Sequence, residues 1–179
     1  MKEIEVKARL RDESAVVRKL EELGVQLSEP IAQDDKVYFP VGAVFAEEGN
    51  RDPALRIRDQ NGRYIFTYKK PDKNNLDKIE FESDINDPEE MAKMCEALGF
   101  ELRTRIKKIR RKAKYKEYEI CLDEVEELGS FIEAESMSED GDSEHIQKEL
   151  FSFLEMLGVN KEDQVFEGYD IMLYKLQKK

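Results

Sequence analysis

A repeated alternation of charged and apolar residues is the feature that most restricts how this chain folds. In residues 3–10, Ile4 and Val6 face one side of an extended strand, whereas Glu3 and Glu5 face the other. The same period of two recurs in further segments, namely 36–39, 54–58, 64–69, 78–82, 106–110, 117–123 and 131–135. The sequence therefore predicts about eight β-strands, many with one charged face.

Four other segments carry apolar residues at helical spacing. Three of them begin near an acidic or hydroxyl residue and end on Leu-Gly, where glycine stops a helix. The expected helices cover residues 12–24, 87–99, 143–158 and, as a short last helix, 169–176. Residues 40–53 are the one obvious long loop, and no linker divides the chain. We therefore expect a single domain over residues 1–179.

The composition supports a globular protein with an ionic surface. Hydrophobic residues make up 40% of the 179 residues and charged residues another 40%, which is enough apolar material for one core. No apolar run approaches the roughly 20 residues that cross a bilayer, and the first residues lack the apolar stretch of a signal peptide. A cytoplasmic protein without membrane contact is expected.

Few residues are available for a nitrogen- or sulfur-based metal site. His145 is the only histidine, and the two cysteines, Cys95 and Cys121, lie far apart in apolar-periodic segments. We predict that both cysteines are small buried side chains. Any metal ion must then be held mainly by carboxylates.

The charge is strongly segregated along the chain. Residues 103–116 contain nine basic residues and no acidic one, whereas residues 122–149 contain eleven acidic residues and one lysine. A basic run of this kind is one way to bind nucleic acid. The formal net charge of −11 argues against such a partner, because proteins that track phosphate backbones are usually net basic.

The charged strand faces have two interpretations. For any one strand, a charged face is most simply a face in water. Taken together, however, cations dominate some faces and carboxylates dominate others. If the sheet closes into a barrel with helices outside, the charged faces line a lumen. A triphosphate would offset the crowded cations, and Mg²⁺ or Mn²⁺ would offset the crowded carboxylates.

The same residues resemble a known family. Glu3-Ile4-Glu5-Val6-Lys7 is similar to the ExExK motif that opens the CYTH superfamily, the triphosphate tunnel metalloenzymes. Further similar segments follow in order over nearly the whole chain: 35–39, 54–58, 67–69, 78–80, 108–110, 122–125, 128–135 and 168–173. The resemblance is nearest to the CyaB branch, named for its class IV adenylyl cyclase. It implies an α+β fold, a closed or nearly closed eight-stranded antiparallel β-barrel with helices packed outside.

The resemblance also implies a role for each matching residue. The metal ligands for Mg²⁺ or Mn²⁺ would be Glu3, Glu5, Glu80, Asp123, Glu133 and Glu135, with Glu80 also orienting its neighbours or a metal-bound water. The triphosphate would be bound by Lys7, Arg56, Arg58, Lys69, Lys78, Lys108 and Arg110. The residues at the reacting centre would be Glu3, Glu5, Lys7 and Glu133.

Several functions remain open at this point. The first is a class IV adenylyl cyclase that converts ATP into cyclic AMP and pyrophosphate. The second is a triphosphatase acting on thiamine triphosphate, a nucleoside triphosphate or inorganic tripolyphosphate. A more remote alternative is a non-catalytic polyphosphate-binding module, which would not need the carboxylates. Dimerisation is common among such barrels, so we also expect a homodimer, although no motif points to it.

Overall fold

The computed structural model describes residues 2–44, 52–71, 77–138 and 143–178, apart from the side chains of residues 2, 71, 77 and 78. In these residues one antiparallel sheet is combined with four α-helices. The strands are β1 Lys2–Arg9, β2 Ile31–Pro40, β3 Ala54–Gln60, β4 Arg63–Pro71, β5 Asp77–Ile85, β6 Phe100–Tyr115, β7 Tyr118–Val125, β8 Gly129–Ser138 and β9 Gln164–Val165. The helices are α1 Glu13–Glu22, α2 Pro88–Ala97, α3 Ser143–Met156 and α4 Tyr169–Gln177, with a 3₁₀ turn at Lys161–Asp163.

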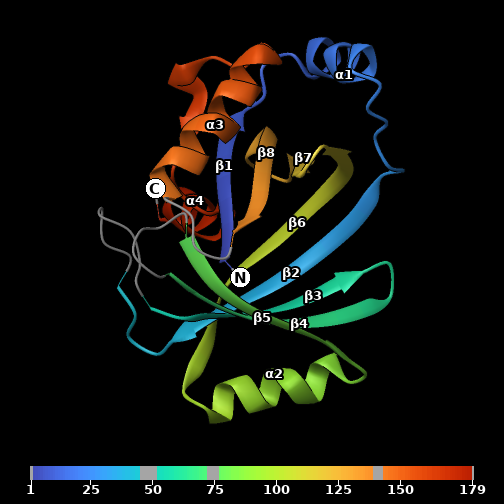
Figure 1. Ribbon diagram of the computed structural model, residues 1–179. Coiled ribbons are helices and arrows are strands. Elements are labelled where there is room, and N and C mark those ends of the chain that lie inside the picture. The colour runs from blue at the N-terminus through green and yellow to red at the C-terminus, as the bar shows by residue number, and fades with distance from the viewer. Residues whose placement is uncertain (1, 45–51, 72–76, 139–142, 179) are drawn as a thin grey trace.

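The sheet curls into a barrel whose two edges meet over a short seam. The strand order is β5-β4-β3-β2-β6-β7-β8-β1-β9, and β1 also pairs with β5 at Glu3–Lys78 and Ile4–Asp77. Beyond these two residue pairs, β9 lies against β1 at Lys7–Val165. The expected α+β fold with a nearly closed antiparallel barrel is confirmed (Figure 1). The two-residue strand β9 was not predicted.

The apolar faces of β1, β7 and β8 are covered from outside. Ile4 and Val6 of β1 are buried with Leu20 of α1 and with Leu150 and Leu154 of α3 in one cluster. This is the packing that the alternation in residues 3–10 predicts, because a one-residue shift in register would turn every apolar side chain away from the helices.

Helix α2 covers a second part of the outer surface, on the other side of the barrel in Figure 1. Its buried Cys95 packs with Leu55 and Ile57 of β3. The helix begins at Asp87, whose carboxylate accepts hydrogen bonds from the backbone N–H groups of Glu89 and Glu90. Asp87 therefore caps the N-terminus of the helix, where the sequence predicts that the helix begins.

Helix α4 packs differently from the other three. Tyr169 and Leu173 are buried with Val37 and Ile106, residues that lie directly across the strands from Arg56 and Asp35. Directly paired residues share one face of a sheet, so α4 contacts the charged, inner face of the barrel. The expectation that helices lie outside therefore holds for α1, α2 and α3 but not for α4. None of the helices in the described residues is long and apolar enough to cross a membrane.

Candidate functional site

The register of β1, β7 and β8 places predicted carboxylates in rows across the lumen. Glu5 lies opposite Glu135, and Lys7 lies opposite Glu133. On the other side of β8, Glu135 lies opposite Glu119 of β7. The Glu5–Glu135–Glu119 row thus spans three neighbouring strands.

Ten of the thirteen predicted site residues line a single cavity of about 620 Å³. They are Glu3, Glu5, Lys7, Arg56, Arg58, Lys69, Lys108, Arg110, Glu133 and Glu135. Glu80 lies beside this cavity and forms ion pairs with Arg56 at 3.2 Å and with Lys69 at 2.7 Å. Lys78 lies in β5 opposite Glu3, but its side chain is outside the described part of the structure.

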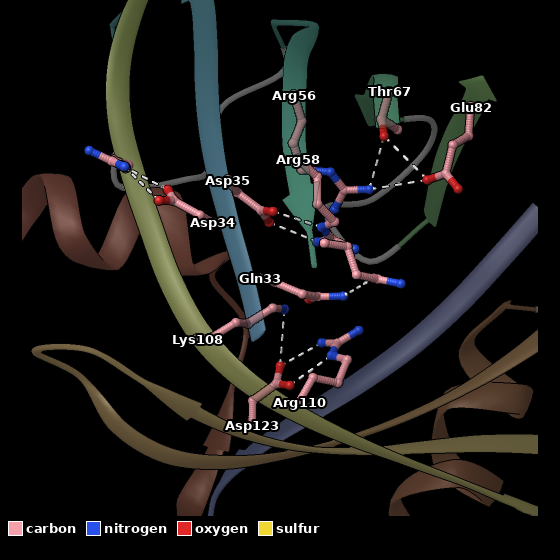
Figure 2. A network of polar contacts seen from close by, with 12 residues as sticks. Gln33, Asp34, Asp35, Arg56, Arg58, Thr67, Glu82, Lys108, Arg110 and Asp123 are labelled. Carbon is pink, nitrogen blue, oxygen red and sulfur yellow. Dashed lines mark hydrogen bonds and ion pairs between the residues drawn. The ribbon is translucent and has the colours of Figure 1, made fainter. Parts of the chain in front are cut away.

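Asp123 is buried beneath the cation cluster. Its carboxylate accepts hydrogen bonds from Arg110 Nε at 2.7 Å and from Lys108 Nζ at 3.2 Å. The Tyr169 hydroxyl donates a further hydrogen bond to Asp123 Oδ2 at 3.0 Å. These contacts fix the directions of Arg110 and Lys108 inside the barrel (Figure 2).

A second carboxylate, Asp35 of β2, fixes Arg58. Both oxygens of Asp35 accept hydrogen bonds from Arg58 at 2.7 Å, which is the bidentate geometry that favours arginine over lysine. Burial tends to raise the pKa of Asp35, but the hydrogen bonds and charge of Arg58 lower it to about 2. Sequence reasoning missed Asp35 as a site residue, although it begins one of the segments that resemble the family.

Arg56 lies two residues before Arg58 in β3, on the same face of the strand. Its Nη2 donates hydrogen bonds to Thr67 Oγ1 at 3.0 Å and to Glu80 at 3.2 Å. Its Nε has no hydrogen-bond partner within the ranges that the structure describes. Burial and the neighbouring charge of Arg58 lower the pKa of Arg56. This side chain therefore keeps a buried donor for a further acceptor.

Positive charge is crowded around Lys108. Burial and the nearby Arg110 lower the pKa of Lys108 to about 8, even though Asp123 and Glu133 act in the opposite direction. Glu133 itself is held ionised despite burial, because Arg110 and the two lysines Lys7 and Lys108 keep its pKa well below its usual range. An anion in the cavity would relieve the repulsion among these cations.

Negative charge is crowded around Glu135, which lies opposite Glu5 in the row next to the Lys7–Glu133 pair. Burial raises the pKa of Glu135 to about 8, and the charges of Glu3, Glu119 and Glu133 act in the same direction. Burial also tends to raise the pKa of Glu119, but contacts with Lys112 and Glu135 lower it. Glu119 was absent from the predicted site. The period-two pattern placed it on a face of β7, but only the register shows which residues it meets.

The carboxylates fit a hard divalent cation by their chemistry. Mg²⁺ and Mn²⁺ prefer oxygen ligands, and the carboxylates of Glu3, Glu5, Glu133 and Glu135 line the same cavity. Within residues 2–44, 52–71, 77–138 and 143–178, no three acidic, histidine or cysteine side chains already form a complete ligand set.

The basic run 103–116 is divided between two faces of β6. Lys108 and Arg110 point into the lumen (Figure 2), whereas Arg105 pairs with Asp34 on the opposite side of the sheet, at 2.5 Å. The run is therefore divided between the cavity and the outer surface of the barrel. Both cysteines are buried, as predicted.

Comparison with known proteins identifies the family. The model of the CYTH domain matches residues 1–169, which is nearly the whole chain. This chain belongs to the CYTH family. A protein of Methanocaldococcus jannaschii named "putative adenylate cyclase MJ0240" is 34% identical over 172 residues, covering 94% of this chain and 97% of that protein. The CYTH family binds triphosphate substrates and depends on divalent metal ions.

Solved structures agree with this assignment. The PH1819 protein of Pyrococcus horikoshii has 28% sequence identity and a TM-score of 0.80, with 99% of each chain covered. HpAC1 from Hippeastrum, described as a "putative adenylyl cyclase" with a dominant triphosphatase activity, has 20% identity and a TM-score of 0.64. The alignment with HpAC1 covers 98% of the present CYTH chain and 96% of HpAC1, and at this identity it shows a common fold.

Proposed function

We propose that this CYTH protein is a metal-dependent enzyme that converts ATP into cyclic AMP and pyrophosphate. The observation that carries the proposal is the pairing of two charge clusters within one cavity. Arg58, Lys108 and Arg110 supply positive charge on one side, and Glu3, Glu5 and Glu135 supply negative charge on the other. A triphosphate and a divalent cation offset these two clusters together.

The cations would bind the triphosphate through its oxygens. Arg58 and Arg110 are already held by Asp35 and Asp123, so their guanidinium groups lose little freedom when a phosphate arrives. Lys7, Arg56, Lys69, Lys78 and Lys108 would complete the phosphate site. Cations held in this way stabilise the negative charge that develops on phosphoryl oxygens and on the leaving group.

The carboxylates would hold Mg²⁺ or Mn²⁺. We assign this role to Glu3, Glu5, Glu133 and Glu135, with Glu80 at the margin. Asp123 accepts hydrogen bonds from Arg110, Lys108 and Tyr169 and, unlike Glu133, is not among the described residues that line the cavity, so we propose that it positions cations instead of binding the metal. When bound, the metal supplies positive charge next to the phosphates and lowers the cost of charge transfer to the leaving group.

Cyclisation requires a nucleoside as well as a triphosphate. The ribose 3′ hydroxyl must reach the α-phosphorus while the bond to pyrophosphate breaks, so the organic group must be held in place. The cavity also has an apolar wall, formed by Val37, Ile106 and Met172. An apolar wall suits the organic part of a nucleoside triphosphate, whereas inorganic tripolyphosphate has no apolar part to contact it. The name of the Methanocaldococcus relative supports the same reaction.

A triphosphatase is the second candidate. Its reaction needs a water in line with the terminal phosphorus, and the same cations and carboxylates would serve it. The description of the Hippeastrum protein supports this candidate, because it pairs the cyclase name with a dominant triphosphatase activity. The two candidates differ in the nucleophile, which is the ribose 3′ hydroxyl or water, and in the phosphorus that it attacks.

Product analysis tests the proposal. The protein is incubated with Mg²⁺ or Mn²⁺ and, in parallel, with ATP, thiamine triphosphate or inorganic tripolyphosphate. We expect cyclic AMP and pyrophosphate in equal amounts from ATP. Orthophosphate without cyclic AMP would establish the triphosphatase, and no product from any substrate would support the binding module.

Two variants connect the activity to the site. Glu5→Gln removes one charge from the carboxylate row without changing side-chain volume, so we expect turnover to fall at least about 100-fold with the fold intact. The control is Glu124→Gln, which changes an exposed carboxylate of β7. Equal loss in both variants would remove the carboxylate row from the mechanism.

A cytoplasmic location and a homodimer stay predictions.

A further inference from the structure

Tyr169, the first residue of α4, lies between several charged groups of the cavity. The Nζ atom of Lys7 lies 4.1 Å from the centre of the Tyr169 ring, and the Nζ atom of Lys108 lies 5.0 Å from it. The hydroxyl of the same residue donates a hydrogen bond to Asp123 Oδ2 at 3.0 Å. One side chain thus contacts both lysines and the carboxylate that orients Arg110.

The ring is itself held firmly. It packs edge-on against Phe131, with 5.0 Å between ring centres and 63° between ring planes. Only 6% of the residue is exposed. Leu173, one turn later, is buried in the same cluster, and Thr104 Oγ1 donates a hydrogen bond to the backbone oxygen of Asp170 at 3.3 Å. Tyr169 is therefore anchored independently of the lysines.

A lysine side chain is a point charge on a flexible stem, so its ammonium group must be held by neighbours to bind a phosphate at a defined place. Salt bridges hold part of each group: Lys7 contacts Glu133 at 3.1 Å, and Lys108 contacts Asp123 at 3.2 Å. The face of an aromatic ring attracts an ammonium group without neutralising it. A ring therefore fixes the lysines while leaving their charge available to an anion.

We propose that Tyr169 is a positioning residue of the triphosphate site, in which its ring holds Lys7 and Lys108 and its hydroxyl holds Asp123. The phosphate site is then formed by residues of the strands together with the first turn of α4. The proposal rests on the proposed function for its effect on triphosphate binding, whereas its effect on the two lysines is independent of any reaction.

The independent effect is measured by lysine acylation. Tyr169→Leu removes the ring, Tyr169→Phe keeps it, and Tyr174→Leu is the control on the same helix, where Lys178 lies 4.4 Å from the ring centre. Mass spectrometry after brief treatment with acetic anhydride reports modification of each lysine. We expect Lys7 and Lys108 to react several-fold faster in Tyr169→Leu, with Tyr169→Phe and the control matching the native protein. Unchanged rates in a folded Tyr169→Leu protein would overturn the proposal.

Binding and kinetics test the link to the site. We expect Tyr169→Leu to bind inorganic tripolyphosphate about tenfold more weakly than the native protein does. Calorimetry measures this affinity in a buffer that contains EDTA, which removes free metal ions. Tyr169→Phe should keep that affinity but lower kcat, because only the hydroxyl bond to Asp123 is lost. A Tyr169→Phe protein with both native affinity and native kcat would contradict the role of the hydroxyl. Native affinity in a folded Tyr169→Leu protein would contradict the role of the ring. Failure of the native protein to bind or turn over triphosphates would overturn the proposed function, whereas the acylation result would still stand.

Discussion

Buried charges in this barrel are stabilised by specific partners at the level of single residues. Asp35 and Arg58 have side chains only 3% and 10% exposed, and two hydrogen bonds join them. Removing one member of such a pair leaves the other charge buried and unpaired, which is more costly than losing an exposed pair. The pair serves the site, because it fixes Arg58 toward the cavity.

The carboxylate of Asp35 makes the stability of the protein depend on pH in the acid range. Its pKa of about 2 lies below the ordinary value of 3.8, so its contribution is complete above pH 4 and is lost as the pH falls toward 2. We expect native protein to exceed Asp35→Asn in free energy of unfolding by about 2 kcal/mol or more at pH 7, and this difference to shrink below pH 4.

Urea unfolding between pH 3 and pH 7 measures this difference. The matched control is Asp34→Asn, whose pair with Arg105 lies on the outer side of the sheet with more exposed side chains. The control should change stability by less than about 1 kcal/mol. A difference for Asp35→Asn that does not vary with pH would show that its carboxylate is not held ionised by Arg58.

At the scale of elements, the helices divide into two classes by the face of the sheet that they contact. Leu154 of α3 is fully buried against the outer face, and Leu173 of α4 is 2% exposed against the inner face. Both leucines contribute to stability through buried area. Only α4 also contributes residues to the cavity wall, including Tyr169 and Met172.

Two leucine variants separate these contributions. Leu154→Ala and Leu173→Ala each create a cavity, so we expect each to lower the free energy of unfolding by about 2–5 kcal/mol. Only Leu173→Ala should also weaken tripolyphosphate binding, because it loosens the helix that carries Tyr169. Denaturant unfolding and calorimetry on both variants provide the measurements. Equal affinities in the two folded variants would show that α4 does not support the site.

The sequence predicted most elements but not all of their arrangement. Alternation predicted the strands and their charged faces, and helical spacing predicted the four helices, three of them with a terminal glycine. Alternation does not give register, so Glu119 was not recognised as a neighbour of Glu135. Nor does it show which face of the sheet a helix covers, and α4, with apolar and aromatic residues in nearly every turn, fitted either face.

At the scale of the whole molecule, one carboxylate of the lumen, Glu135, is destabilising when it is ionised. The formal net charge is −11, and Glu135 is crowded by other carboxylates inside the barrel. Its pKa is raised from 4.5 to about 8, so the folded state resists its ionisation and loses stability as the pH rises between these values. A bound divalent cation would recover that stability.

The variant Glu135→Gln tests this balance. Without metal at pH 9, we expect it to unfold at a higher temperature than native protein, whereas at pH 4 the two should be nearly equal. Adding Mg²⁺ at 100 times its dissociation constant should stabilise the native protein by about 2.7 kcal/mol and the variant by clearly less. Thermal unfolding with and without Mg²⁺ measures both effects, with Glu124→Gln as control. Equal stabilisation of native protein and Glu135→Gln would exclude Glu135 as a ligand.

The seam of the barrel has a consequence for how the protein is made on the ribosome. Strand β1 is synthesised before all the strands that pair with it; β5 pairs with it only at Glu3 and Ile4, and β8 and β9 lie more than 120 residues later in the chain. Glu5 and Lys7 therefore lie on a part of β1 whose partner strands are synthesised much later. The lumen is completed only after β8 and β9 have been synthesised, so a nascent chain that ends before β8 holds the ExExK segment without a complete site around it.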